Sequence, residues 1–183
     1  MRTYVGLVHY PVYNKNMEKI ASSITTLDIH DIARLSRTYE VKRFYVITPL
    51  IDQQRIVKAI IDHWTKGYGA KYNPDRKEAI RLVDVVESIE EAVRKIEERE
   101  KERPVIIATD AKRQKRFISF EDARKILEKK TVFILFGTAW GLHKEVLENV
   151  DFVLEPIYGR GDYRHLSVRT AAAIIIDRLI GEG

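Results

Sequence analysis

Cysteine is absent from this chain of 183 residues. Its absence excludes disulfide bonds, thiolate zinc sites, iron–sulfur clusters and cysteine nucleophiles. Long hydrophobic runs are also absent, since the longest, Val132–Phe136 and Ala171–Ile176, fall far below the ~20 residues of a membrane span. The first residues, Met1–Tyr4, lack the apolar stretch that a signal peptide carries. We therefore expect a soluble, cytoplasmic protein that does not bind a membrane.

Sequence motifs of several common enzyme classes are missing as well. No G-x-x-x-x-G-K-[ST] occurs, which disfavours a P-loop nucleotidase, and no G-x-G-x-x-G follows a predicted strand. No G-x-S-x-G nucleophile elbow is present. The five histidines form no i, i+4 pair, so we expect no metal site.

Charge is plentiful, and its sign is mildly biased. Lysine and arginine number 32 against 27 acidic residues, a net charge of +5, which permits a polyanionic partner without requiring one. Two basic clusters stand out, in residues 55–81 and at Lys112–Arg116. Each can also be a solvated helix face, as the mixed charges of Glu87–Arg103 indicate for that stretch.

Short apolar runs alternate with longer amphipathic segments along the whole chain. This order predicts an α/β fold, with a mostly parallel sheet and helices on both faces, in a single domain of residues 1–183. The predicted strands are Tyr4–His9, Arg43–Thr48, Arg81–Val86, Pro104–Thr109, Thr131–Phe136 and Asp151–Glu155. The predicted helices are Asp28–Tyr39, Asp52–Lys66, Ser88–Arg99, Ser119–Lys129, Lys144–Glu148 and Ser167–Ile180.

Two of these helices carry specific expectations. Ser88 and Glu91 form a capping-box pair at the start of one helix. In the helix at 52–66, the apolar face is expected to be Ile56, Val57, Ile60, Ile61 and Trp64. Ligands of parallel sheets bind beyond the carboxyl ends of the strands, which directs attention to the loops at 109–112, 137–141 and 156–165.

Several segments of the chain are unusual in combination. They are Asp28–Ser36, Tyr72–Arg76, Phe136–Leu142, Pro156–Gly159 and His165–Ile174. In this order they resemble the SPOUT superfamily of RNA methyltransferases, whose members carry F-G-x…G-L, P-[MI]-x-G and S-L-N-V-S-x-A-A-A-I motifs. Within that superfamily the sequence is most similar to a bacterial branch of RNA methyltransferases related to tRNA (guanine-N1-)-methyltransferases.

The resemblance implies a trefoil knot within residues 131–174, a homodimer and S-adenosyl-L-methionine (SAM) as cofactor. It also implies that each active site is completed by the partner's N-terminal helix. The residues that it places around the cofactor come from the three C-terminal loops and the strand before one of them. They are Thr109, Leu135, Phe136, Gly137, Trp140, Gly141, Ile157, His165, Leu166 and Ser167.

The methyl-acceptor site is expected to need a cation and a base. Arg34 is the candidate for stabilising developing negative charge or holding a phosphate, because its guanidinium stays protonated. Asp28 and Asp162 are candidate bases, with His30 and Asp31 left open beside them. The sequence departs from the family at Ala139, where many members have glutamate, and at Ser167, where they have asparagine.

An RNA substrate, tRNA or rRNA, is the expected partner. Cations next to aromatic side chains are typical of RNA-binding surfaces. The candidate RNA-binding residues are Lys66, Lys71, Arg76, Lys112, Arg113, Lys115 and Arg116. Two other functions stay open: an RNA-binding module that holds the cofactor without turnover, and a metabolic enzyme with a small acidic substrate.

Overall fold

The computed structural model describes residues 1–112, 114, 117–161, 163 and 165–181. Its centre is a seven-stranded sheet in the order β5-β4-β1-β8-β6-β9-β7, with every neighbouring pair parallel. The strands are β1 (Thr3–Val8), β4 (Arg43–Ile47), β5 (Val83–Val86), β6 (Val105–Thr109), β7 (Phe117–Ile118), β8 (Val132–Gly137) and β9 (Phe152–Leu154). A separate hairpin joins β2 (Val12–Tyr13) to β3 (Lys19–Ile20).

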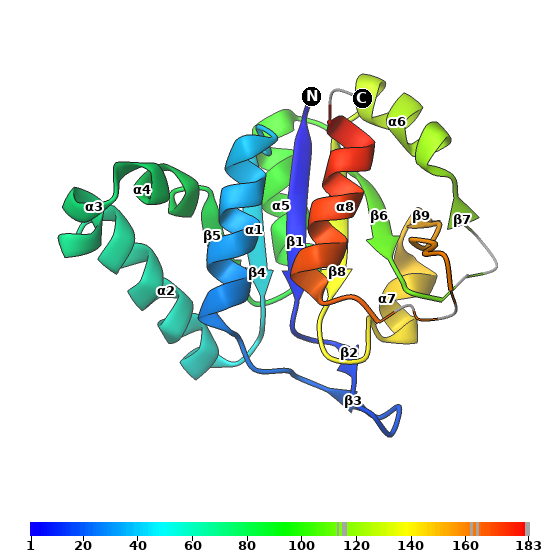
Figure 1. Ribbon diagram of the computed structural model, residues 1–183, viewed down its shortest axis with the longest axis horizontal. Coiled ribbons are helices and arrows are strands. Elements are labelled where there is room, and N and C mark those ends of the chain that lie inside the picture. Colours follow the sequence, from blue (N-terminus) through cyan, green and yellow to red (C-terminus); the bar gives the residue numbers. More distant parts are fainter. Residues whose placement is uncertain (113, 115–116, 162, 164, 182–183) are drawn as a thin grey trace.

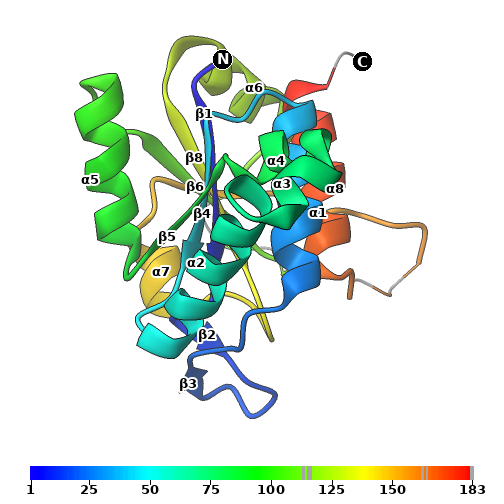
Figure 2. The same cartoon turned by 90° about the vertical axis from the view of Figure 1, so that its left-hand side faces the viewer.

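Helices cover both faces of this sheet, as predicted (Figures 1 and 2). The helices are α1 (Thr26–Thr38), α2 (Ile51–Thr65), α3 (Tyr68–Tyr72), α4 (Pro74–Ile80), α5 (Ile89–Glu100), α6 (Phe120–Lys129), α7 (Lys144–Asn149) and α8 (Val168–Ile180). One apolar layer contains buried residues of α1, α2, α4, α6 and α8, and the other contains those of α5 and α7. Figure 2 shows α5 and α7 on one side of the sheet and α1 and α8 on the other.

Strand β8 shows how the sequence builds two cores. Side chains of a strand point alternately to opposite faces, so a strand that is buried on both sides can be apolar throughout. Ile134 and Phe136 belong to the core layer that includes α1 and α8, whereas Phe133 and Leu135 belong to the layer that includes α5 and α7. The central position of this apolar strand follows from that double burial.

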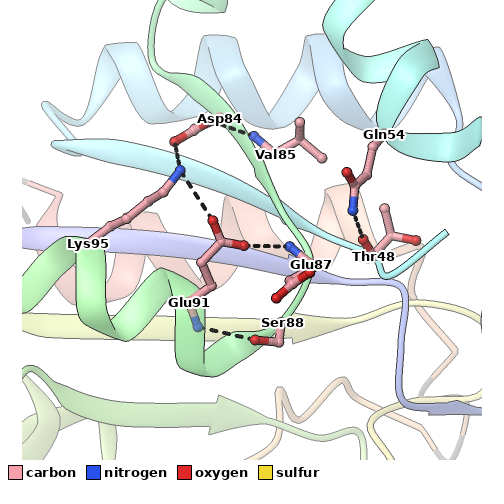
Figure 3. Close-up of polar contacts among 8 residues, drawn as sticks. All are labelled: Thr48, Gln54, Asp84, Val85, Glu87, Ser88, Glu91 and Lys95. Atoms are coloured by element: carbon pink, nitrogen blue, oxygen red, sulfur yellow. Dashed lines mark hydrogen bonds and ion pairs between the residues drawn. The ribbon is translucent and has the colours of Figure 1, made fainter. Parts of the chain in front are cut away.

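The capping box at the start of α5 is confirmed with one difference. The Ser88 hydroxyl accepts the backbone N–H of Glu91 at 3.2 Å, and the Glu91 carboxylate accepts the backbone N–H of Glu87 at 2.8 Å (Figure 3). The reciprocal bond therefore reaches one residue further than the cap itself. Lys95 donates to Asp84 at 3.0 Å, which ties the first turns of the helix to the preceding strand β5.

Sequence periodicity missed the shorter elements. The hairpin, α3, α4 and β7 were not predicted, although Asn73 followed by Pro74 is a helix-start signal. The expected apolar face of α2 is wrong at Ile56, which is 43% exposed, whereas Ile60, Ile61 and Trp64 pack against the core. Val57 is fully buried there.

Three expectations concern the chain as a whole: the absence of a membrane span, the knot and the domain boundary. Among the described residues, no helix combines the length and apolar character needed to cross a bilayer. The trefoil knot at 131–174 and the single-domain boundary stay predictions.

Candidate functional site

A cavity of about 710 Å³ lies at the carboxyl ends of the central strands. Its wall includes residues that directly follow β6, β8 and β9, namely Asp110, Thr138 and Glu155. The start of α8 and the segment between β3 and α1 close it from the other side. The volume is in the ~300–1,000 Å³ range of small-molecule and cofactor sites.

The loop after β8 is held in an unusual conformation. Ala139 has φ of 52° and Gly141 has φ of 102°, a region that side chains rarely adopt. A Cβ on Gly137 would lie 2.7 Å from the backbone nitrogen of Leu142, so the chain folds back against itself there. A Cβ on Gly141 would meet no atom within 4 Å. Gly141 therefore leaves space beside the backbone on the cavity wall.

The β2–β3 hairpin fixes this loop through backbone hydrogen bonds. The N–H of Trp140 donates to the carbonyl of Tyr13 at 3.0 Å, and the N–H of Tyr13 donates to the carbonyl of Gly141 at 3.0 Å. Trp140 itself is 63% exposed. The hairpin thus supports the loop from outside while the indole stays at the cavity mouth.

A chain of polar side chains runs from the cavity wall to the buried His9. The Thr138 hydroxyl donates to the carbonyl of Val8 at 3.0 Å and contacts the Ser22 hydroxyl, which lies 3.0 Å from His9 Nδ1. We assign the ring proton to Nδ1, because Ser22 then donates to Thr138 and accepts from the ring. Burial lowers the pKa of His9 to about 4, so the ring is neutral at pH 7.

The opposite wall is built where α1 meets α8. The Asp28 carboxylate accepts the Thr25 hydroxyl at 2.6 Å and pairs with Arg169 at 3.2 Å. Arg169 also pairs with Asp31 at 3.3 Å. One α8 arginine therefore joins two turns of α1, and it places Asp28 on the cavity wall.

The start of α8 supplies small residues to the same wall. The Ser167 hydroxyl accepts the backbone N–H of Thr170 at 3.3 Å and caps the helix. Ala171 lines the cavity one turn later. A methyl side chain at that position lets a ligand lie close to the helix.

This geometry agrees with the comparisons to known proteins. A family model described as SAM-dependent RNA methyltransferase matches residues 2–181. The chain belongs to this family.

Curated relatives support the assignment. A tRNA (guanine-N(1)-)-methyltransferase of Oleidesulfovibrio alaskensis is 50% identical over 179 residues, 98% of this chain and 42% of the relative. A protein of the same name from Nitratidesulfovibrio vulgaris is 45% identical over 179 residues, with the same coverage of 98% and 42%. The chain thus spans about two-fifths of the length of these relatives. An uncharacterized protein of Aquifex aeolicus is 38% identical over 178 residues, 96% of this chain and 87% of that protein.

Solved structures confirm the predicted fold class. The SpoU methyltransferase AviRb from Streptomyces viridochromogenes superposes with a TM-score of 0.62 at 15% identity, covering 97% of this chain and 58% of that one. The TrmH/SpoU tRNA modifying enzyme of Aquifex aeolicus gives 0.56 at 16% identity, covering 97% and 72%. The parallel α/β sheet is therefore confirmed, and the resemblance to RNA methyltransferases is confirmed by the family model and the curated relatives.

SAM is the cofactor of this methyltransferase family, and the cavity fits it. The space beside Gly141, which a Cβ would fill, lets a ligand approach the backbone amides and carbonyls of the loop. Every residue expected around the cofactor, apart from Leu135, lines the cavity. These residues are Thr109, Phe136, Gly137, Trp140, Gly141, Ile157, His165, Leu166 and Ser167.

Leu135 lies elsewhere. Its side chain is fully buried in the core layer of α5 and α7, because it points to the opposite face of β8 from Phe136. Its side chain therefore does not reach the cavity. Its carbonyl accepts the Thr109 hydroxyl at 3.0 Å, so it supports the cavity wall through the backbone.

Sequence analysis missed the N-terminal part of the wall. Met17, Ser22, Ser23 and Thr25 line the cavity, and all four lie in the stretch between β2 and α1. That stretch has no helical or strand periodicity. Its Ser and Thr residues, just before the predicted helix, were the available signal, and Thr25 is indeed the N-cap of α1.

The three candidate catalytic residues have different positions. Asp28 lines the cavity, and Arg34 lies instead in a groove between α1 and α4. Six residues along a helix rotate the side chain by about 600°, so the two point about 120° apart. Asp162 lies outside the described residues.

The candidate RNA-binding residues are also spread over two regions. Lys112 lines the cavity, and Lys66 pairs with Asp62 at 2.7 Å on α2. Arg76 lies over the Trp64 ring, 4.7 Å from its centroid. Arg113, Lys115 and Arg116 lie outside the described residues. Within the described part of the chain, no group of three or more acidic or histidine side chains is placed to hold a metal ion.

Proposed function

We propose that this chain transfers the methyl group of SAM to tRNA. The observation that carries the proposal is the cavity at the strand ends, lined by the three loops that the SPOUT resemblance assigns to the cofactor. The relatives named tRNA (guanine-N(1)-)-methyltransferase support tRNA as the RNA class and make guanine N1 the first atom to examine.

The chain's own contribution is to position and to supply charge. When bound, SAM supplies a methyl group on a positively charged sulfur, already activated for displacement. The backbone at Gly137 and Gly141 would hold the cofactor, with Ile157 and Leu166 as apolar walls. A fixed geometry accelerates such a displacement, because it removes the entropy of bringing the reactants together.

Of the candidate bases named from the sequence, Asp28 is the one that lines the cavity among the described residues. Its carboxylate is only partly exposed, and Thr25 and Arg169 hold it in one orientation. A ring N–H that is methylated must lose its proton, and an oriented carboxylate at the wall can accept it. Asp28 would therefore accept the proton of the acceptor base.

Arg34 requires a second subunit to reach a cofactor. It does not line the cavity of its own protomer, and its side chain makes no ion pair with any residue that the structure describes. The exposed Leu27, 61% accessible, lies on the same helix. We infer a homodimer in which α1 and α8 form the interface, and Arg34 stabilises negative charge at the partner's acceptor site.

Methyl incorporation tests the activity. Labelled SAM should methylate tRNA lacking its own modifications, and mapping of the product should locate the atom. No incorporation into any tRNA or rRNA, together with normal SAM affinity, would favour the RNA-binding module without turnover.

Mixed dimers test the contribution of Arg34 across subunits. At a SAM concentration too low to load the Gly141→Val site, Arg34→Ala and Gly141→Val should each have little activity alone. If Arg34 serves the partner's site, a mixed dimer of the two regains one complete site, with intact Arg34 and an intact loop. If Arg34 acts within its own protomer, the mixed dimer stays inactive, which rejects the shared site.

A further inference from the structure

Helices α3 and α4 project from the edge of the molecule beside α2 (Figure 1). On α3, Tyr68 and Tyr72 are 75% and 73% exposed. Their rings lie 6.0 Å apart between centroids with planes at 23°, so they stack on each other and leave their outer faces in solvent. Two large aromatic side chains are thus ordered without being buried.

A basic groove begins next to this pair. Asn73 directly follows Tyr72, caps α4 by accepting the backbone N–H of Arg76 at 2.9 Å, and lines a groove of about 260 Å³. Arg34 and Arg37 of α1 face Arg76 of α4 across this groove. Its lining therefore includes three guanidinium groups and one carboxylate, that of Asp75.

These cations are only partly neutralised. Arg37 pairs with Glu78 at 3.1 Å, whereas Arg34 and Arg76 make no ion pair with any described residue. Nε of Arg76 is buried with no hydrogen-bond partner among the described atoms. The Trp64 ring holds the Arg76 guanidinium in place, so this cation is oriented before a ligand arrives.

We propose that the Tyr68–Tyr72 pair stacks an unpaired RNA base and that the groove binds the adjoining backbone phosphate. This inference rests on the proposed function, since it names how the RNA substrate is held. Aromatic faces bind bases of any sequence, and guanidinium groups bind phosphate oxygens. Lys71 lies between the two tyrosines in the sequence, is exposed and makes no ion pair with a described residue, which adds attraction for the backbone.

The position of Arg34 connects this surface to catalysis. The groove contains the arginine that the proposed function assigns to the partner's acceptor site. RNA that lies on the tyrosine pair therefore continues toward that site. The surface is specific for unpaired nucleotides, because a base within a duplex has no free face to stack on the rings.

The test compares Tyr68→Ala/Tyr72→Ala with Tyr68→Phe/Tyr72→Phe. Fluorescence anisotropy measures binding to a labelled RNA hairpin with an unpaired loop and to a fully paired duplex. The alanine variant should lose at least about fivefold in affinity for the hairpin, and the phenylalanine variant, which retains both rings, should bind like wild type. Duplex affinity and calorimetric SAM affinity should be unchanged in both, and the SAM measurement verifies the fold.

Several outcomes overturn the inference. Unchanged hairpin affinity in the alanine variant rejects the stacking surface, and so does an equal loss in the phenylalanine variant. A change of oligomeric state in the alanine variant, with RNA affinity unchanged, would assign the tyrosines to a contact between copies instead.

Different results would reject the tyrosine surface and the proposed methyl-transfer activity. Normal methylation with unchanged binding by the alanine variant rejects only the tyrosine surface. Hairpin binding that depends on the two rings, without any methyl transfer by the wild-type protein, rejects only the activity.

Discussion

Two regions of the molecule are built in opposite ways: the cofactor cavity and the flank, by which we mean the Tyr68–Tyr72 pair and the groove between α1 and α4. The cavity is shaped by backbone: a loop with two residues at positive φ, a hairpin bonded to it and a His9–Ser22–Thr138 chain. The flank presents side chains, with exposed tyrosines on a five-residue helix and arginines around a groove. The first is a cavity whose volume suits one small ligand, and the second suits a flexible polyanion.

This difference predicts which property each substitution changes. A substitution at the cavity should alter cofactor affinity, turnover or stability, since its parts depend on one another. A substitution on the flank should alter RNA affinity alone, because its groups protrude separately into solvent. Arg34 is the residue that breaks this division, as it lies on the flank of its own protomer and is proposed to act at a cavity.

Arg34→Ala should have the largest effect. Removal of a group that stabilises transition-state charge lowers the turnover number by about 10²–10³-fold. SAM affinity should stay normal, because Arg34 does not line its own cavity. Arg37→Ala, one turn away in the same groove, is the matched control and should retain turnover at saturating RNA. Full methyl transfer by Arg34→Ala on its RNA would return Arg34 to the RNA-binding groove alone.

His9 should make the cavity side sensitive to acid. Its pKa is about 4 when folded against 6.5 for an exposed histidine, because burial disfavours the charged ring. Between these two pH values the unfolded chain therefore binds more protons than the folded one. The free energy of unfolding is undiminished by His9 above pH 6.5 and falls as the pH is lowered toward 4. Across that window the loss is about 3 kcal/mol.

Denaturant unfolding of wild type and His9→Gln between pH 4 and 7 measures this contribution. The variant should be less stable at pH 7, and its stability should fall less on acidification. Parallel curves for the two proteins would show that His9 does not titrate in this range. The measurement needs neither SAM nor RNA, so it reports the contribution of His9 to stability separately from ligand binding.

Gly141→Val should weaken SAM binding by about tenfold or more. A branched residue at φ of 102° is strained by about 1–3 kcal/mol, and its side chain would occupy the open space beside the loop. Gly141→Ala is the graded comparison, because it adds one methyl group at the same φ and should weaken SAM binding less than valine does. Calorimetry that gives equal SAM affinity for wild type and a folded Gly141→Val protein would remove the loop from the cofactor site.

The sequence predicted the residues of the cavity better than the elements of the flank, because strand order alone brings the cavity residues together. Parallel strands bring their carboxyl ends to one edge, so residues at or after the ends of β6, β8 and β9 had to meet, and Thr109, Gly137 and Ile157 all line the cavity. Leu135 does not line the cavity because side chains alternate between the two faces of a strand, and Phe136 takes the cavity side. The sequence motif alone does not show which of the two faces the cavity. Gly137 and Gly141 indicate the loop from sequence alone. The β2–β3 hairpin that supports this loop has no periodic pattern, so the sequence does not predict it.

The flank was less predictable because its elements are short. Helices of five and seven residues are below the length at which apolar periodicity is readable, so the sequence pattern predicts neither α3 nor α4. Tyr68 and Tyr72 stand four residues apart, the spacing that brings helical side chains together. That spacing becomes meaningful only once residues 68–72 are known to be helical.

Lys71→Gln and Lys112→Gln should have the smallest effects and should separate the two regions most finely. Lys71 is exposed on the flank, and Lys112 lies on the cavity wall; each is expected to contact one RNA phosphate. Loss of one contact should reduce the slope of log affinity against log salt by about 0.7–0.9, because fewer counterions are released on binding. Lys129→Gln, at the exposed last turn of α6, removes the same charge away from both regions and should leave the slope unchanged. Because the two lysines share no partner, the reductions should add in the double variant. A Lys71→Gln slope equal to that of wild type, beside a reduced Lys112→Gln slope, would mean that RNA passes the cavity without contacting the flank.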